Sequence, residues 1–171
     1  MTGRTGKMTL GSFLKENGLQ ILMYLLGAVL TGLVWWPLAP IYLVICVASN
    51  IFYMYWVCPY CGHYHLGTCA AGFDVLSGRR FKAELDRTFR GQFRLGTIVV
   101  GLGWFIPPIA ALYLLVIHFS WTALYWWAIL ALLAVFCVVA FWLLPEASKK
   151  HCDGCETVDC PRRPKKAKTA A

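Results

Sequence analysis

Charged side chains are scarce in this chain and are absent from two long stretches of it. Only 14% of its 171 residues are charged, whereas a soluble domain carries about a quarter. No Asp, Glu, Lys or Arg lies between Glu16 and Asp74 or between Arg94 and Glu146. Because a membrane helix needs roughly 20 apolar residues, each stretch has room for two spans. The sequence therefore predicts an all-α integral membrane protein with four transmembrane helices, arranged as two antiparallel hairpins.

The absence of several functional motifs limits the classes of function that the chain can have. The chain has no phosphate-binding glycine loop and no serine or metalloprotease motif. Ion-coupled transporters and proton pumps normally carry charged groups inside their spans to bind or relay charge, and no expected span has one. These absences favour a non-enzymatic protein over an enzyme or a pump.

Apolar runs divide the chain into five segments. The two predicted hairpins are separated and flanked by polar sequence that contains all the charged residues. The segments are a cytoplasmic N-terminal segment (1–17), transmembrane hairpin 1 (18–57), a cytoplasmic Cys/His loop with an amphipathic helix (58–94), transmembrane hairpin 2 (95–144), and a cytoplasmic cysteine cluster with a basic disordered tail (145–171).

Four features give detail to the hairpins. Residues 37–40 begin and end with proline and predict the tight turn of the first hairpin. The proline pair 107–108 predicts a kink in the third span. Gly101 and Gly103 are expected to let another helix approach closely, and Asn50 to hydrogen-bond across helices.

The second half of the 58–94 loop predicts an interfacial helix. Phe81, Leu85, Phe89 and Phe93 recur at every fourth residue, and arginines flank this apolar stripe. Such a helix lies in the headgroup plane, where its basic face is attracted to anionic lipid. The anionic bilayer surface is therefore an expected partner.

The distribution of basic residues predicts the topology. All sixteen Lys and Arg residues precede the first span, lie in the 58–94 loop, or follow the fourth span. Short segments rich in Lys and Arg stay in the cytoplasm, so both termini and the central loop are expected there. The cytosol keeps thiols reduced, which favours metal binding or redox chemistry over disulfides for cysteines on this face.

Two clusters of cysteine and histidine follow the second and fourth expected spans. Residues 58–62, with the sequence Cys-Pro-Tyr-Cys-Gly, resemble the C-P-x-C-G knuckle of zinc-ribbon and related zinc-binding modules. The second cluster supplies another C-x2-C pair, and two such pairs make a four-cysteine zinc site. The candidate metal ligands are Cys58, Cys61, His63, His65 and Cys69 in the first cluster, and His151, Cys152, Cys155 and Cys160 in the second.

Spacing leaves the ligand set and the metal open. Each cluster alone offers three cysteines and a histidine, which is also a zinc-binding combination. An iron-sulfur cluster is the main alternative to Zn²⁺, because Cys152, Cys155 and Cys160 followed by Pro161 loosely match a ferredoxin pattern. A thiol redox pair and a soft-metal handling site for an ion such as Cu(I) are further alternatives.

The sequence thus predicts a multi-pass membrane protein with a cytoplasmic metal-binding module. The expected role is a non-enzymatic scaffold or accessory subunit that recruits a protein partner through the metal-bound face. A membrane electron-transfer subunit with an iron-sulfur cluster is the alternative. The basic tail is expected to contact anionic headgroups rather than nucleic acid.

Overall fold

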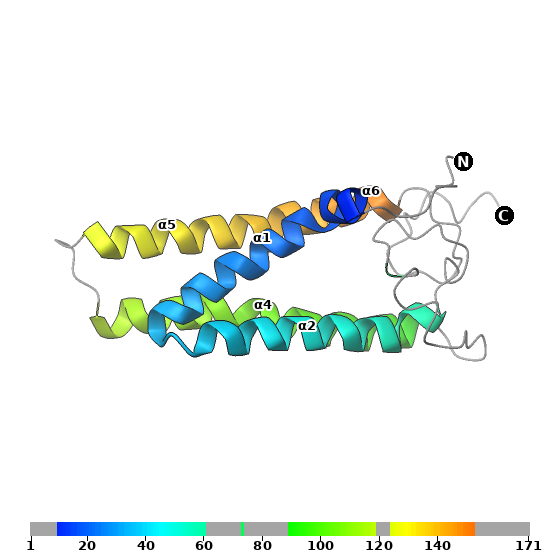
Figure 1. The fold of residues 1–171 in the computed structure, drawn as a ribbon, viewed down its shortest axis with the longest axis horizontal. Coiled ribbons are helices and arrows are strands. Elements are labelled where there is room, and N and C mark those ends of the chain that lie inside the picture. The colour runs from blue at the N-terminus through cyan, green and yellow to red at the C-terminus, as the bar shows by residue number, and fades with distance from the viewer. Residues whose placement is uncertain (1–9, 61–72, 74–88, 119–123, 153–171) are drawn as a thin grey trace. The chain divides into compact units, whose positions relative to one another are not determined.

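The structure is a computed structural model that describes residues 10–60, 73, 89–118 and 124–152 (Figure 1). Within these ranges the chain is helical, and no β-strand occurs among them. The elements in chain order are α1 (Leu10–Val34), α2 (Leu38–Trp56), the 3₁₀ turn η1 (Cys58–Tyr60), α4 (Phe89–His118), α5 (Leu124–Val138), the π-helical segment η2 (Val139–Leu143) and α6 (Leu144–Cys152).

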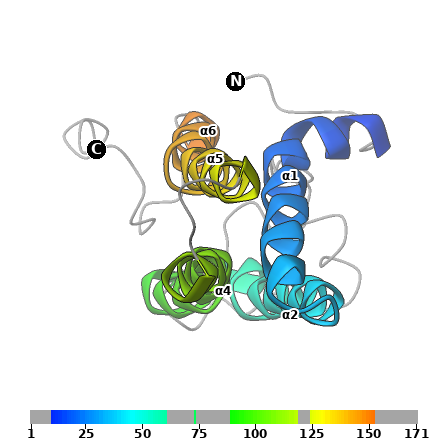
Figure 2. The same ribbon diagram turned by 90° about the vertical axis from the view of Figure 1, so that its left-hand side faces the viewer.

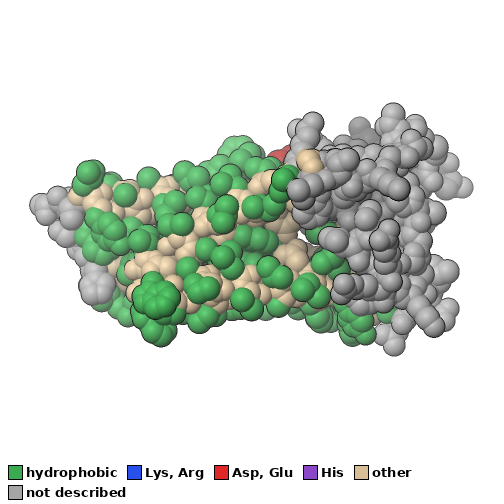
Figure 3. Space-filling model, in the orientation of Figure 1, with side chains coloured by type: hydrophobic (Ala, Val, Ile, Leu, Met, Phe, Trp, Pro, Cys, Tyr) green, Lys and Arg blue, Asp and Glu red, His purple; other side chains and the backbone are tan. Residues whose placement is uncertain are grey.

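In the part of the chain that the structure describes, four helical segments are long and apolar enough to cross a membrane, as the sequence predicted. They are Asn17–Val34, Leu38–Tyr60, Gly91–Ile117 and Leu124–Ser148. Large apolar side chains are exposed along all of them, as Val44 and Val116 illustrate at 67% and 83% exposure. Figure 3 shows hydrophobic side chains over much of the visible face of these helices. A surface of this kind suits lipid rather than water.

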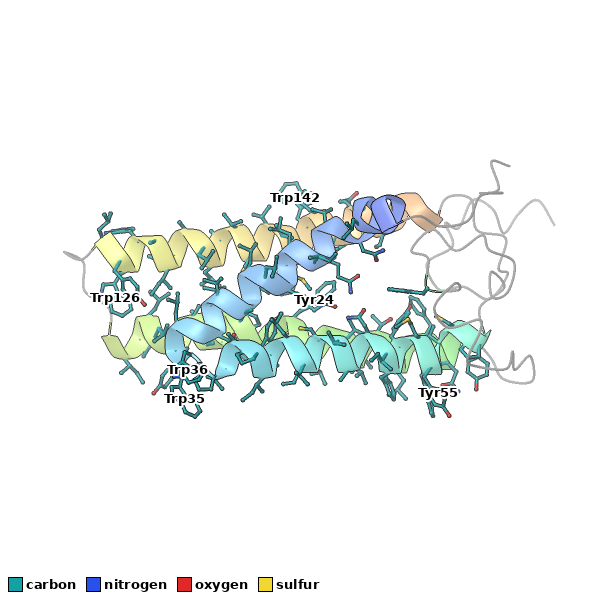
Figure 4. All side chains as sticks on the ribbon, in the orientation of Figure 1. Tyr24, Trp35, Trp36, Tyr55, Trp126 and Trp142 are labelled. Atoms are coloured by element: carbon teal, nitrogen blue, oxygen red, sulfur yellow. The ribbon has the colours of Figure 1, made fainter. Side chains whose placement is uncertain are left out.

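Aromatic side chains lie near the ends of these spans. Trp35 and Trp36 close the first span, and Tyr55 lies near the end of α2 (Figure 4). All three are more than half exposed. Amphipathic aromatic rings at such positions are typical of the membrane interface.

The chain divides into two compact units, and the division follows its charge. One unit, here called the charged unit, comprises Met1–Asn17, Ile51–Ile98 and Glu146–Ala171. The other, the charge-free unit, comprises Gly18–Asn50 and Val99–Pro145. Every Asp, Glu, Lys and Arg of the sequence falls in the first, and none falls in the second. The charge-free unit can therefore be placed in hydrocarbon without burying a charge.

The charge-free unit has its own core, built by segments of four helices. α1 packs beside α2 and against α4 and α5, as the view along the helices shows (Figure 2). Because interior positions recur every three or four residues on each helix, one stripe of each faces the others. The main cluster consists of Met23, Leu30, Ala111, Leu114, Ile129, Phe136, Val139 and Ala140, and the second of Ala28, Tyr42 and Cys46.

A short turn joins α1 to α2, two residues earlier than predicted. Leu38 N–H donates to the Trp35 carbonyl at 2.9 Å, so the turn lies at 35–37 rather than at 37–40. Pro40 is part of α2. Proline is tolerated in the first turn of a helix, since no intrahelical acceptor is available there for an N–H.

α1 and α2 approach each other closely at Gly27. A Cβ atom added to this glycine would lie 2.6 Å from Cε1 and from the hydroxyl oxygen of Tyr42. Tyr42 is only 1% exposed, so its ring is held in place by the surrounding core. Absence of a side chain at position 27 thus sets the distance between these two helices.

The glycines of α4 behave differently from the prediction. A Cβ added at Gly101 or Gly103 would meet no other described atom within 4 Å, so neither glycine marks a close helix contact. The close contact lies at Gly96, where an added Cβ would be 2.5 Å from Val57 Cγ2. α4 begins at Phe89, ahead of the expected span, and continues through Pro107 and Pro108 to His118. Residues 81–88 of the predicted interfacial helix lie outside the described residues.

The fourth span contains a π-helical segment that the sequence did not predict. In η2 the Leu144 N–H donates to the Val139 carbonyl, which is five residues back rather than four. Pro145 follows directly, and a proline ring in an α-helix clashes with the carbonyl four residues earlier, here that of Phe141. The wider π turn gives that carbonyl more room, and the helix continues as α6 to Cys152.

Gly27→Ala should destabilise the protein, because the new methyl group would overlap the fixed ring of Tyr42. The expected loss is about 1–3 kcal/mol in free energy of unfolding, measured by denaturation in detergent. Gly101→Ala is the matched control: it adds the same methyl group in open space and should be neutral or stabilising by up to about 1 kcal/mol. Equal stability of the two variants would contradict the packing described for α1 and α2.

Candidate functional site

Cys58 is the one predicted metal ligand whose side chain the structure describes. α2 ends at Trp56, and Cys58 begins the 3₁₀ turn η1 with Pro59 and Tyr60. The Tyr60 N–H donates to the Val57 carbonyl at 3.2 Å, which closes this turn. The Cys58 side chain is buried, at 9% exposure, as are its neighbours Val57 and Pro59. The thiol is therefore held next to the end of the span rather than extended into solvent.

Cys152 is at the end of another helix. α6 carries His151 and Cys152 as its last two residues, and the structure describes their backbone only. Cys61, His63, His65, Cys69, Cys155 and Cys160 lie outside the described residues. Among the residues that are described, no group of three or more His, Cys, Asp or Glu side chains is close enough to hold a metal.

The two C-x2-C pairs have a common structural setting. Each pair starts where the helix of a span ends, with Cys58 after α2 and Cys152 at the end of α6. Both cysteines belong to the charged unit. This setting places the backbone of the first cysteine of each pair at the end of a helix.

A cluster of uncharged polar side chains lies between α1 and α2 in the charge-free unit. The Gln20 amide nitrogen Nε2 donates to the Tyr24 hydroxyl at 2.6 Å and to Asn50 Oδ1 at 2.9 Å. Asn50 Nδ2 donates to the same Tyr24 hydroxyl and, at 2.8 Å, to the Cys46 carbonyl. Figure 4 shows Tyr24 on the side of α1 that faces the other helices.

The Cys46 carbonyl fixes the orientation of this cluster. It is an acceptor only, so it requires the NH₂ group of Asn50 on its side and turns Asn50 Oδ1 toward Gln20. That oxygen in turn requires the NH₂ group of Gln20. Both amides therefore present N–H groups to Tyr24, whose hydroxyl oxygen accepts two hydrogen bonds.

The sequence predicted only one member of this cluster. Asn50 was expected to bond across helices, and its contact with Gln20 on α1 confirms this. Gln20 and Tyr24 were missed, although they lie four residues apart and hence on one helix face. The available signal was that Gln20 and Asn50 are the two amide side chains of the predicted first hairpin, 18–57.

Comparison with known proteins does not assign a function. No protein-family model, no curated protein and no solved structure matches this chain. Function is therefore inferred from the chain's own residues.

Asn50→Leu should destabilise the α1–α2 contact, because Gln20 and Tyr24 would each lose a hydrogen-bond partner in hydrocarbon. Such bonds between membrane helices contribute about 0.6–2 kcal/mol each, and thermal unfolding in detergent would measure the loss. Ser49→Ala is the control, because the Ser49 hydroxyl bonds only within α2, to the Cys46 carbonyl. A cluster of no energetic importance would leave both variants equally stable.

Proposed function

We propose that this chain is a multi-pass membrane protein whose cytoplasmic face carries a cysteine and histidine metal-binding module, with zinc as the metal. The four-cysteine site consists of Cys58, Cys61, Cys152 and Cys155. Cys69, Cys160, His63, His65 and His151 are additional or alternative ligands. The observation that carries the proposal is the position of the first cysteine of each C-x2-C pair, Cys58 just after α2 and Cys152 as the last residue of α6.

The number of spans supports a common side for the two pairs. Four helices of spanning length separate the N-terminal segment, the central segment and the C-terminal segment by an even number of crossings. These three segments contain every Lys and Arg, and basic residues stay in the cytoplasm. Both pairs thus face the cytosol, where thiols are reduced and available to a metal.

The thiol chemistry and the turn at Cys58 fit a structural zinc site. Zinc is bound by thiolates in closed tetrahedral sites, and a bound ion stabilises segments too short to form a core of their own. A metal shared between the two pairs would join the end of the second span to the end of the fourth. The buried position of Cys58 restricts the freedom of that ligand before the metal binds.

Recruitment of a partner is the role that this module supports best. A metal-stabilised cytoplasmic face offers a fixed surface beside the bilayer, and the surrounding basic residues add attraction to anionic headgroups. The protein then acts as a non-enzymatic scaffold or accessory subunit. An electron-transfer subunit with an iron-sulfur cluster in the same cysteines is the competing function.

Metal analysis distinguishes these functions. Protein purified anaerobically in mild detergent should contain about one zinc per chain and show no visible absorbance. Cys58→Ser with Cys61→Ser should remove the metal, whereas Cys137→Ser, a change within a span, should retain it. Iron and sulfide in similar amounts, with visible absorbance, would establish the electron-transfer alternative. Wild-type protein without metal would refute the module.

A C-terminal fusion tests the topology. Green fluorescent protein fused after Ala171 should fluoresce, and alkaline phosphatase at the same position should be inactive in a bacterial host, because the tail is cytoplasmic. The reverse pattern would place both cysteine clusters in an oxidising compartment, where disulfides become the expected state of these thiols.

A further inference from the structure

The Gln20–Tyr24–Asn50 cluster has a hydrogen-bond donor and an acceptor that the described protein leaves unused. A tyrosine hydroxyl has one proton to donate and two lone pairs. Both lone pairs of Tyr24 accept N–H groups, from Gln20 and Asn50, and its own proton has no acceptor among the described residues. Gln20 Oε1 likewise has no donor in the described part of the chain.

These two groups lie inside a span. Gln20 and Tyr24 are three and seven residues from Asn17, where the first span begins, and a rise of 1.5 Å per residue places them about 5 Å and about 10 Å inside that end. The unit around it contains no charged residue. An unsatisfied polar group in such surroundings carries a penalty of several kcal/mol. A ligand that satisfies both groups would remove this penalty, which contributes favourably to its binding free energy.

A single hydroxyl group matches this pair. Its oxygen accepts the Tyr24 proton, and its own proton goes to Gln20 Oε1. A carbonyl or an ether would satisfy only Tyr24, and a protonated amine, which has no lone pair, would satisfy only Gln20. We propose that Gln20 and Tyr24 bind the hydroxyl group of a neutral lipid, such as a diacylglycerol or a long-chain alcohol.

The surroundings favour a lipid hydroxyl over a water molecule. A buried water typically makes about three hydrogen bonds, and the cluster offers two. In an alcohol the oxygen is also bonded to a carbon chain, which is soluble in an apolar environment and needs no hydrogen bond. Gln20 and Tyr24 are half-buried rather than enclosed, so part of each side chain is accessible to lipid.

The absence of charge sets the class of lipid. An ionised headgroup at the depth of Tyr24 needs a counter-charge, and the nearest charged residue on α1, Glu16, lies eight residues before Tyr24. The site therefore favours a neutral lipid over a phospholipid. The inference concerns only α1 and α2 and does not depend on the cysteine clusters.

The test is retention of 1,2-dioleoylglycerol by the full-length protein. Protein in detergent is incubated with this lipid or with trioleoylglycerol, in which the hydroxyl is esterified, and native mass spectrometry counts the bound molecules. Wild-type protein should retain one dioleoylglycerol and no trioleoylglycerol. Tyr24→Phe and Gln20→Met each remove one hydrogen bond to the lipid hydroxyl, besides bonds within the cluster, and should weaken binding about tenfold.

Tyr113→Phe is the matched control, because Tyr113 is an exposed tyrosine within the third span; it should bind like the wild type. Circular dichroism establishes that each variant is folded, and Gln20→Met carries the test if Tyr24→Phe does not fold. Equal retention of the two lipids, undiminished binding by the folded variants, or folded wild-type protein that binds no dioleoylglycerol would each overturn the proposal. The last result would assign the two free groups to water.

Discussion

Hydrocarbon does not solvate polar groups, and the rest of this structure depends on that constraint. It separates the chain into one unit that holds every charge and another that holds none. It also explains the short polar side chains of the spans. Thr31 donates to the Gly27 carbonyl at 2.9 Å and Ser49 to the Cys46 carbonyl at 3.0 Å, so each hydroxyl is satisfied within its own helix.

Longer polar side chains have more groups than their own helix satisfies, and they also link helices. Gln20 and Asn50 bond to each other across α1 and α2, and Gly27 lets the ring of Tyr42 lie against α1 in the same interface. The polar cluster and the close glycine contact thus act together. One fixes which residues of the two helices face each other, and the other fixes their separation.

The sequence predicted the spans because hydropathy and charge are properties of single segments. It did not predict which glycines lie at close helix contacts. Gly27 has the ring of Tyr42 opposite it and Gly101 has no described atom nearby, and this difference depends on the fold. The turn was predicted at 37–40 rather than at its observed position, 35–37, because both Pro37 and Pro40 are compatible with a helix start. For the metal module, spacing identifies thiols such as Cys58 and Cys152 but not how they combine, because ligands from distant segments meet only through the fold.

The π-helical segment has a consequence for the rotational setting of the fourth span. An α-helix turns by about 100° per residue, and a π turn accommodates one extra residue. Residues after η2 are therefore rotated about the helix axis by roughly that angle, compared with an uninterrupted α-helix. The side of the helix that carries Phe136 in α5 is not continued by the residues that α-helical spacing would assign to it in α6. A pattern read straight through Pro145 would misassign which residues after η2 continue the side of the helix that carries Phe136.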